Sequence, residues 1–302
     1  RDLLHRFSDN DCLRFLRFTR AQVVRLANML GVPRVVKTDC GFVVDGMCAL
    51  TVLLHRLAYP CTLKHLELVF GLSSSRISET FNFMLHWVHS KWGYLLKLDI
   101  DRIVHLLPEF AEAVHASGAP MTRVWGFVDG TVRPVARPKR HQEVMYNSHK
   151  RCHAFKFQGT VTPDGVMVSL HGPAEGARHD AYVYQRSGLG RLMQEHMNID
   201  GQAYQVYGDP AYGLSQHLCT PYTATSAAAL TPQMCEFNSR MAACRVSVEW
   251  IFGEQKSLLS PVATQYRVSV FLTNLHTCLN GGNQISDYFG VKPPTPEQYL
   301  GI

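Results

Sequence analysis

The sequence predicts an α+β protein in which a helical N-terminal region precedes a part rich in strands. Two observations support this fold class. Apolar residues recur at helical spacing up to about residue 118, and from Met121 onward short β-prone runs alternate with turn residues. Gly118 and Pro120 stand between the two patterns. We therefore expect an all-helical N-terminal domain over 1–118, with a domain boundary before Met121.

The composition is that of a globular protein with a substantial core. The chain has 302 residues, of which 46% are hydrophobic, and its formal net charge is +6. Its nine cysteines are scattered without a C-x-x-C pair. This pattern indicates a reducing compartment and argues against a disulfide framework or a structural zinc site. No run reaches transmembrane length, so we expect no membrane partner. Because the sequence opens with Arg1, we expect it to be part of a longer chain.

Local signals place the helices of the N-terminal region. Thr19 and Gln22 form a capping-box pattern ahead of an apolar run that Gly31 ends. A mostly apolar stretch over 43–59 predicts a buried helix. A last helix is expected over 101–116, bent or restarted at its proline.

Residues 62–90 have the outline of a helix-turn-helix. Two helical patterns flank the turn Gly71-Leu72-Ser73-Ser74-Ser75. In DNA-binding proteins of this kind the start of the second helix touches DNA, which makes Ser74 and Arg76 candidate DNA contacts. An αα-hairpin without any DNA contact has the same pattern, and the residues alone favour that alternative.

The strand-rich part begins with Val124-Trp125-Gly126-Phe127-Val128, a run typical of a buried strand. We expect Gly130 to stop this strand and to leave Asp129 at its open end. Two further strands, over 155–162 and 166–171, are joined by a Pro-Asp-Gly turn that predicts a hairpin.

A second β-prone run also ends in an aspartate. A helix is expected over 179–196, broken near its two glycines, and Tyr204-Gln205-Val206-Tyr207 follows it. Asp209 comes two residues after this run, and Pro210 keeps Asp209 out of the helical region. The element order is therefore β-β-β-α-β-α, with a carboxylate after the first strand and after the fourth.

A third carboxylate lies on a helix expected over 239–256. Glu249 shares one side of this helix with Ala242 and Val246. Since small and apolar residues indicate a buried face, Glu249 should need a strong partner there. A salt bridge to Arg245, one turn earlier, contributes only about 0.2–0.5 kcal/mol on an exposed face. A divalent cation is the stronger alternative.

Asp129, Asp209 and Glu249 together match the needs of a two-metal nuclease site. Hard oxygen ligands hold two Mg²⁺ or Mn²⁺ ions roughly 4 Å apart in such sites. A lone aspartate after a strand is more often a turn former or a helix cap, and the recurrence of the pattern is what favours a metal site. Asp-Gly-Thr also occurs in aspartate-nucleophile phosphatases, whose loop reads D-x-D-G-T. Phe127 stands where their nucleophile would be, which excludes that class.

Several motifs give the chain a family resemblance. The chain resembles the DDE endonuclease domain of PIF/Harbinger-type transposases, including harbinger transposase-derived nucleases, through nearly its whole length. Single motifs of this kind are weak, but their joint order and spacing are specific. The matching stretches are Phe127-Val128-Asp129-Gly130-Thr131, Tyr146-Asn147-Ser148-His149-Lys150-Arg151, Phe155-Lys156-Phe157-Gln158, Gly172-Pro173-Ala174-Glu175-Gly176-Ala177-Arg178-His179-Asp180, Tyr207-Gly208-Asp209-Pro210-Ala211-Tyr212 and Val246-Ser247-Val248-Glu249-Trp250-Ile251-Phe252-Gly253.

The resemblance implies a fold and an activity. The fold would be an RNase H-like nuclease domain over 121–280. Apart from the resemblance, Pro293, Pro294 and Pro296 predict an extended tail over 281–302. Asp129, Asp209 and Glu249 would be the metal-binding and catalytic triad for hydrolysis of a DNA phosphodiester and transfer of the freed 3′-hydroxyl to a target strand. The implied partners are DNA, a Myb-like DNA-binding protein and a second copy of the chain during synapsis. The implied location is the nucleus.

Further residues are candidates for supporting roles. Asp180 and His179 are candidate accessory residues, although Asp180 is equally explained as the first residue of a helix and His179 is better explained as a cap or core residue. The segment 123–151 holds seven basic residues against two acidic ones, which suits a polyanionic substrate. The candidate phosphate contacts are His149, Lys150, Arg151 and Lys156.

A second class of function fits the same residues. A domesticated, non-catalytic DNA-binding or scaffold protein would keep the transposase fold without turnover. The three acids argue against this alternative, because a protein without catalysis has no chemical need for them.

Overall fold

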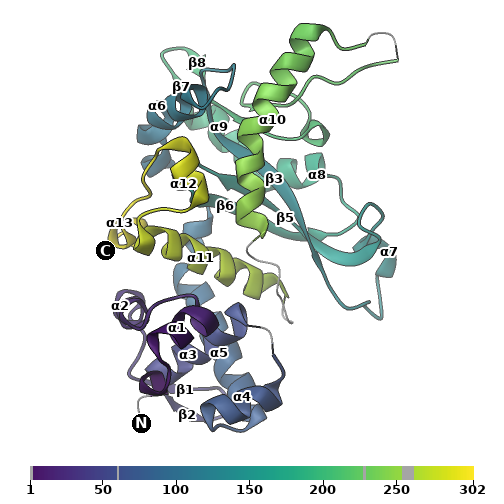
Figure 1. The fold of residues 1–302 in the computed structure, drawn as a ribbon. Coiled ribbons are helices and arrows are strands. Elements are labelled where there is room, and N and C mark those ends of the chain that lie inside the picture. Colours follow the sequence, from purple (N-terminus) through teal and green to yellow (C-terminus); the bar gives the residue numbers. More distant parts are fainter. Residues whose placement is uncertain (1–2, 60, 227–228, 254–261) are drawn as a thin grey trace. The chain divides into compact units, whose positions relative to one another are not determined.

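The computed structural model describes residues 3–59, 61–226, 229–253 and 262–302. It divides the chain into two compact units, of which one is Arg1–Tyr94 with Gln255–His276 and the other is Leu95–Glu254 with Thr277–Ile302. The first unit is mostly helical and the second contains the main sheet (Figure 1). A helical N-terminal region with a mixed sheet is the α+β class that the sequence predicts. No helix in these ranges is both long and apolar enough to cross a membrane.

The first unit consists of helices and, among its described residues, one short β-ribbon. Its elements are η1 (Leu3–Arg6), α1 (Asp9–Leu16), α2 (Arg20–Leu30), β1 (Val35–Lys37), β2 (Val43–Asp45), α3 (Gly46–Ala58), α4 (Leu63–Phe70), α5 (Ser74–Trp92) and most of α11 (Val262–Asn280). The antiparallel pair β1–β2 corrects the prediction of an all-helical region. Residues 43–45 were expected to be helical, but they pair with β1, and Asp45 caps α3 through the Cys48 N–H.

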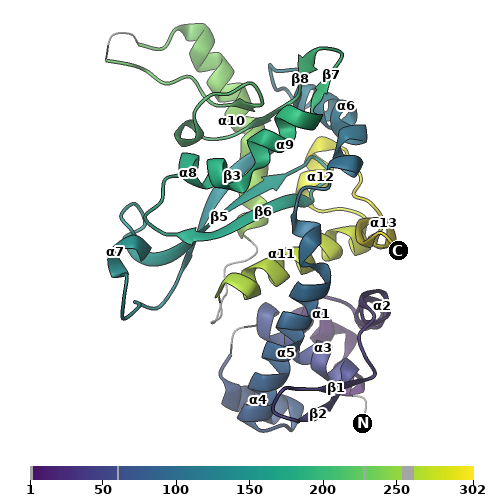
Figure 2. The same cartoon turned by 180° about the vertical axis from the view of Figure 1, so that it is seen from behind.

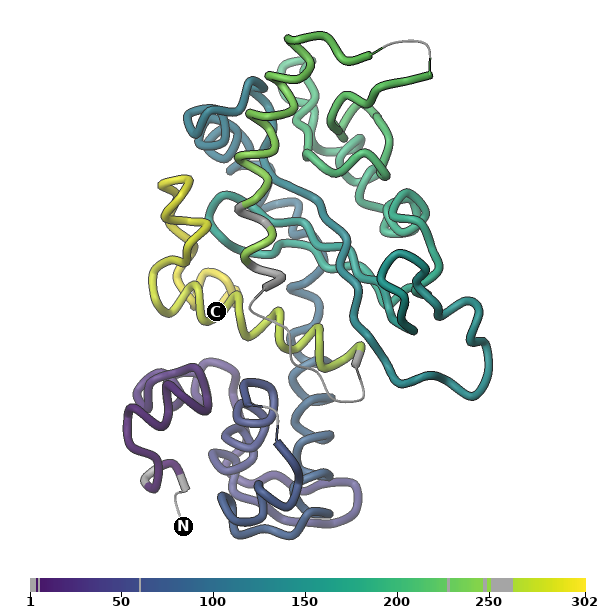
Figure 3. Tube along the Cα trace, turned by 45° about the vertical axis from the view of Figure 1, so that its right-hand side comes forward, coloured from purple at the N-terminus to yellow at the C-terminus, as the bar shows by residue number. Residues whose placement is uncertain are grey.

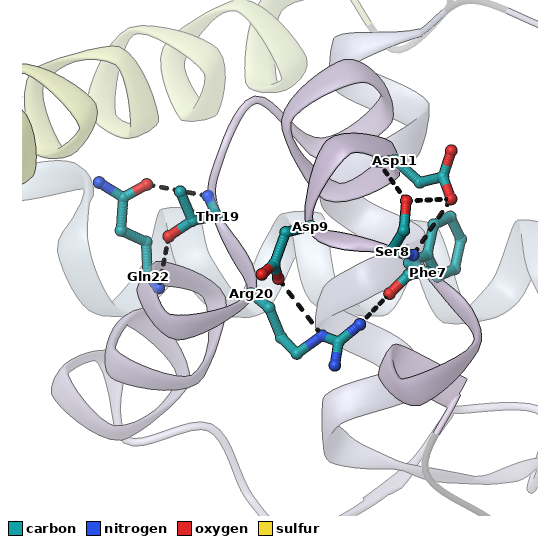
Figure 4. Close-up of polar contacts among 7 residues, drawn as sticks. All are labelled: Phe7, Ser8, Asp9, Asp11, Thr19, Arg20 and Gln22. Atoms are coloured by element: carbon teal, nitrogen blue, oxygen red, sulfur yellow. Dashed lines mark hydrogen bonds and ion pairs between the residues drawn. The ribbon is translucent and has the colours of Figure 1, made fainter.

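Helix α2 begins at the cap that the sequence predicts. The Gln22 N–H donates to Thr19 Oγ1 (3.2 Å) and the Thr19 N–H donates to Gln22 Oε1 (2.9 Å), which confirms the capping box (Figure 4). Gly31 ends the helix in the left-handed conformation, with φ at 67°. Ser8 and Asp11 form a second capping box at α1, which the sequence analysis does not predict.

Helices α4 and α5 have the helix-turn-helix outline expected over 62–90. Thr62 caps α4 and Ser73 caps α5, each by accepting a backbone N–H from the third residue of its helix. The facing side chains of the two helices are buried, which fixes their packing. These buried residues are Leu66, Phe70, Ile77 and Phe81.

The second unit is organised around a mixed sheet with the order β10-β9-β3-β5-β4, in which β6 also pairs with β5. Strands β3, β5, β6 and β4 run antiparallel to their neighbours in that set, whereas β9 runs parallel to β3 and β10 parallel to β9. The strands are β3 (Val124–Pro134), β4 (Tyr146–Asn147), β5 (Cys152–Val161), β6 (Met167–Glu175), β9 (Gln205–Tyr207) and β10 (Leu218–Cys219). The β5–β6 hairpin confirms the turn predicted from Pro-Asp-Gly.

Helices cover both faces of this sheet. Helix α10 crosses one face in Figure 1, and α9 lies over the opposite face in Figure 2. The remaining elements are η2 (Gly93–Leu96), α6 (Ile100–Ala116), α7 (Gln142–Met145), α8 (Asp180–Ser187), α9 (Leu189–His196), the hairpin β7–β8 (Asn198–Ile199 and Gln202–Ala203), η3 (Pro210–Tyr212), α10 (Pro232–Gly253), α12 (Gln284–Phe289) and α13 (Pro296–Leu300). Helix α6 runs through its proline without a restart and packs on β3.

Three predicted boundaries differ from the structure. Strand β3 does not stop at Gly130, because β5 continues to pair with it as far as Pro134. The tail over 281–302 is not extended, because capping boxes at Asn283 and Thr295 start two short helices. Their buried apolar residues include Ile285, Phe289, Tyr299 and Leu300. The compact unit that holds the sheet begins at Leu95, ahead of the expected boundary, since α6 packs on β3.

Candidate active site

The two aspartates lie at the same level of neighbouring strands, Asp129 within β3 and Asp209 two residues beyond the end of β9. Strands β3 and β9 are parallel, with Phe127 paired to Tyr207, and Asp129 and Asp209 each lie two residues further on. Because side chains alternate along a strand, Asp129 is on the same side of β3 as Phe127. A Cβ on Gly208 would lie only 2.9 Å from Val128 Cγ1, so glycine allows this close approach of the two chains.

Asp129 is a half-buried carboxylate within a group of like charges. Burial raises the pKa of Asp129 to about 6, the Arg245 guanidinium and the Gly130 N–H oppose that rise, and the charges of Asp209 and Glu249 add to it. The Gly130 N–H donates to Asp129 Oδ1 at 2.9 Å. The charges of Asp209 and Glu249 therefore both act on Asp129.

Asp209 has a second local role. It precedes η3, and its Oδ1 accepts a hydrogen bond from the Ala211 N–H at 2.8 Å. The cap fixes the direction in which the chain leaves β9, and it leaves Asp209 Oδ2 without a partner from the cap. Asp209 can therefore cap η3 and still offer a carboxylate oxygen to a metal site.

Glu249 reaches this site through an arginine. On α10, Arg245 Nη2 lies 3.7 Å from Glu249 Oε1, and Arg245 Nη1 lies 3.7 Å from Asp129 Oδ1. The salt bridge weighed in the sequence analysis therefore exists, with an unpredicted second partner on β3. The buried helix face expected for Glu249 is not formed. Ala242 and Val246 are exposed, and the Glu249 side chain is 59% exposed. The predicted end of this helix, at Lys256, lies outside the described residues.

A buried ion pair stands beside the acids. Lys156 Nζ, on β5, lies 2.8 Å from Asp180 Oδ1 and donates to the Arg178 carbonyl at 2.8 Å. A Cβ on Gly130 would lie 2.6 Å from Asp180 Oδ1, so this carboxylate packs directly over the backbone that follows Asp129. Glycine is thus required by the Asp180 carboxylate and not by a turn. Asp180 also begins α8, as the helix-terminus interpretation predicts.

Tyr212 places a hydroxyl among the same carboxylates. Its side chain is buried, and its hydroxyl has no hydrogen-bond partner among the described residues. Burial raises the pKa of Tyr212 above its ordinary value, and the charges of Asp180, Asp129 and Asp209 raise it further. Its ring meets that of Tyr184 edge-on at 6.0 Å. Tyr212 follows Asp209 by three residues, and this proximity is the signal by which sequence reasoning could have found it.

The predicted phosphate contacts fall into two groups. His149, Lys150 and Arg151 are exposed in the turn between β4 and β5. They belong to a segment, residues 135–151, that extends from the ends of β3 and β5 around α7 (Figure 3), and we call it the basic arm. Its other exposed cations are Arg137, Lys139 and Arg140. Lys156 is different, because it is buried and paired with Asp180.

The remaining candidates have intramolecular roles or lie at the surface. The Ser74 N–H donates to Glu67 Oε1 at 2.6 Å, which ties α5 to α4. Arg76 Nη2 donates to the Val43 carbonyl at 3.0 Å. His179 is exposed at the N-terminal end of α8 and makes no side-chain cap hydrogen bond. A DNA contact by Ser74 or Arg76 stays a prediction.

The donor chemistry of the site suits a hard divalent cation. Carboxylate oxygens are the ligands that Mg²⁺ and Mn²⁺ prefer, and Asp129, Asp209 and Glu249 would supply them. In the described part of the chain, however, no three His, Cys, Asp or Glu side chains converge closely enough to hold a metal ion. The Arg245 guanidinium lies where two of the acids face each other.

Comparison with known proteins gives one match. Residues 128–278 match the family model described as DDE superfamily endonuclease. Searches of curated proteins and of solved structures give no significant match. The matched segment contains Asp129, Asp209 and Glu249.

Proposed function

The chain belongs to the DDE superfamily endonucleases, and we propose that it is a metal-dependent DNA endonuclease of the transposase type. One observation carries this proposal: Asp129 and Asp209 stand two residues beyond the paired Phe127 and Tyr207, with the charge of Glu249 acting on the same site. Carboxylates from two strands and a helix are the ligand set that a two-metal nuclease needs.

Asp129, Asp209 and Glu249 would hold two Mg²⁺ or Mn²⁺ ions. Bound there, the ions would activate a water and stabilise the leaving oxygen of a DNA phosphodiester. The protein itself supplies position and electrostatics. The Lys156–Asp180 pair and the Tyr212 ring hold the chain around Asp129 and Asp209. After hydrolysis, the freed 3′-hydroxyl would attack a target strand at the same site, so no side chain needs to act as a nucleophile.

The finer classification is also a proposal. The element order β3, β5, β6, α8–α9, β9, α10 supports an RNase H-like core, since it carries the acids on the first strand, after the fourth and on the last helix. The motifs quoted in the sequence analysis support the PIF/Harbinger group. Within that proposal, nuclear location, a Myb-like partner and pairing of two copies at synapsis remain expectations from the resemblance.

DNA would contact the basic arm. Its exposed cations outnumber its acidic residues, and it starts from the strand that carries Asp129. Cations in this position would neutralise phosphates on either side of the scissile bond, which favours binding without reading sequence. His149, Lys150 and Arg151 are the residues for which we propose this role.

A non-catalytic DNA-binding or scaffold protein is the second candidate function. The observation that favours it is Arg245, because a guanidinium between Asp129 and Glu249 partly neutralises the acids without any metal. Such a site needs no bound metal to balance its charges, as a protein without catalytic turnover would require.

The test is nicking of supercoiled DNA in Mg²⁺ and in Mn²⁺, by the wild type and by Glu249→Gln in parallel. The nuclease proposal predicts metal-dependent nicking by the wild type and at least about a hundredfold loss in the variant, as expected for a group acting on the transition state. Equal nicking by both proteins would contradict the assignment of Glu249. If the wild type does not nick DNA, even as a longer chain and with a candidate partner, the result would favour the non-catalytic scaffold function.

A further inference from the structure

Arg245 lies between two acids that are proposed to bind metal. Its Nη1 is 3.7 Å from Asp129 Oδ1, and its Nη2 is 3.7 Å from Glu249 Oε1. The Arg245 side chain is 26% exposed and that of Asp129 is 21% exposed, so this positive charge is partly withdrawn from water. One guanidinium thus bridges a strand and a helix by using its two terminal nitrogens on two separate carboxylates.

The carboxylate oxygens of Asp129 and Glu249 cannot bind the Arg245 guanidinium and a divalent cation at full strength at the same time. A divalent cation coordinates carboxylate oxygens at about 2.0–2.6 Å. A guanidinium that remained within 4 Å of those oxygens would face the cation at close range, and the repulsion between the two positive charges would weaken metal binding. In the described residues no three acidic, histidine or cysteine side chains converge into a metal cluster, and Arg245 contacts two of the three acids.

We propose that Arg245 is a resident counter-cation of the site, which holds Asp129 and Glu249 in place without metal and must leave them for a divalent cation to bind. The inference rests on the proposed function, because it needs metal at these acids. Arg245 is a positioning residue in this scheme, since it acts through the carboxylates. Its position on α10, one turn before Glu249, lets the side chain swing out while the helix stays in place.

A purely structural role would have different consequences. If Arg245 only ties α10 to β3, then its removal loosens Glu249 and weakens metal binding. If Arg245 competes with metal, its removal strengthens metal binding while it destabilises the metal-free protein. The sign of the change in metal affinity therefore separates the two roles.

The experiment is calorimetric titration of Mn²⁺ into the wild type, Arg245→Gln, Arg245→Lys and Arg240→Gln. Arg240 is the matched control, because it lies exposed on the same helix and donates to the Gly118 carbonyl at 2.9 Å. Within the described part of the chain it forms no ion pair with the three acids, so its loss removes one charge elsewhere on α10. Thermal unfolding in EDTA and in Mn²⁺ is measured on every protein, and circular dichroism verifies that each is folded.

We expect Arg245→Gln to bind Mn²⁺ about fivefold tighter or more, the lower end of ordinary couplings between two binding sites. Its melting temperature should fall in EDTA and rise more in Mn²⁺ than that of the wild type. Arg245→Lys, which keeps the charge, and Arg240→Gln should stay within about twofold of the wild type. Equal or weaker Mn²⁺ binding by a folded Arg245→Gln overturns the inference and leaves the nuclease proposal standing.

Two further outcomes are distinguishable. If no variant binds Mn²⁺, the proposed metal site itself is wrong. If Arg245→Gln does not fold, the arginine side-chain NMR signals of the wild type decide the point, with Arg245→Lys used for assignment. Mg²⁺ should then shift the Arg245 Nε–H signal and leave that of Arg240 unchanged. An unmoved Arg245 signal at saturating Mg²⁺ overturns the inference.

Discussion

Lys156 Nζ lies 2.8 Å from Asp180 Oδ1, and this ion pair covers the backbone at Gly130, next to Asp129. The lysine side chain is 10% exposed and the aspartate side chain 25% exposed. The pair therefore packs against the backbone of the candidate site, and its low exposure leaves it poorly placed to contact DNA. Its role can be separated experimentally from that of the exposed cations.

The first prediction concerns this ion pair. Lys156→Met should lower the free energy of unfolding by about 2 kcal/mol or more, because it leaves the Asp180 carboxylate without its partner in a partly buried position. Asp180→Asn should cost a similar amount, and the double variant should cost less than the sum of the two. Urea denaturation of the four proteins measures the coupling. If Lys156→Met instead weakens DNA binding without a loss of stability, Lys156 is the phosphate contact that the sequence analysis expects.

The second prediction concerns the glycine beneath that pair. Gly130→Ala should destabilise the protein by about 1–2 kcal/mol, because its Cβ would lie 2.6 Å from Asp180 Oδ1 and would push the carboxylate off Lys156. In an Asp180→Ala background the same change should cost much less. Denaturant unfolding of the two pairs of proteins checks this, and an equal cost in both backgrounds would show that Asp180 is not the obstacle.

The third prediction concerns the basic arm. Lys150→Ala together with Arg151→Asn should weaken binding to a DNA duplex and reduce the slope of log affinity against log salt by about 1–2, roughly one for each lost phosphate contact. Asparagine is chosen because Arg151 has φ at 52°. Fluorescence anisotropy at several salt concentrations gives the slope.

The matched control for the arm is Arg191→Ala. Arg191 is exposed on α9 and pairs only loosely with Glu195, at 3.7 Å. Its loss should change neither the affinity nor the slope, and the melting temperature of both variants should match that of the wild type. If the arm variant binds DNA with the affinity and salt dependence of the wild type, the basic arm does not contact the DNA phosphates.

The fourth prediction is a pH dependence in the first unit. His55 is buried against the rings of Phe15, Tyr59 and Phe70, and this burial, with a smaller effect from the charge of His65, lowers its pKa to about 4. Between about pH 4 and 6.5 the unfolded chain binds a proton at His55 and the folded chain does not, so stability must fall as the pH falls through this window.

The loss should reach about 3 kcal/mol at the low end of that window. His55→Phe keeps an aromatic ring and removes the titration, so its free energy of unfolding should depend less on pH over the same range. Urea denaturation at pH 4.5, 5.5 and 7 compares the two proteins. Parallel pH profiles would show that His55 does not carry the effect.

Local signals in the sequence were sufficient where neighbouring residues decide the structure. The capping box at Thr19, the hairpin turn between β5 and β6 and the break between α8 and α9 were all predicted, because each depends on a few adjacent residues. The two short C-terminal helices were missed although Thr295 and Gln298 form a capping box. The prolines of this tail favour an extended chain, whereas Pro296 stands in the first turn of α13, where proline is tolerated.

Features that depend on distant residues could not be predicted. Strand β3 runs past Gly130 because β5 pairs with it, and no local pattern contains that partner. Lys156 was expected among the phosphate contacts, but its partner Asp180 is 24 residues away in the chain and meets it only after folding. For the same reason the sequence pointed to Arg245 as a partner for Glu249 and not for Asp129.

The central claim is that the segments around Asp129, Asp209 and Glu249 share one metal site. Fe²⁺ can replace Mg²⁺ at carboxylate sites, and with ascorbate and peroxide it cleaves the polypeptide next to where it is bound. The account predicts cuts near all three residues in the wild type, suppressed by excess Mg²⁺ and lost in Asp129→Asn, with the fragments identified by mass spectrometry. Cuts at unrelated positions, or cuts that persist unchanged in a folded Asp129→Asn, would contradict it.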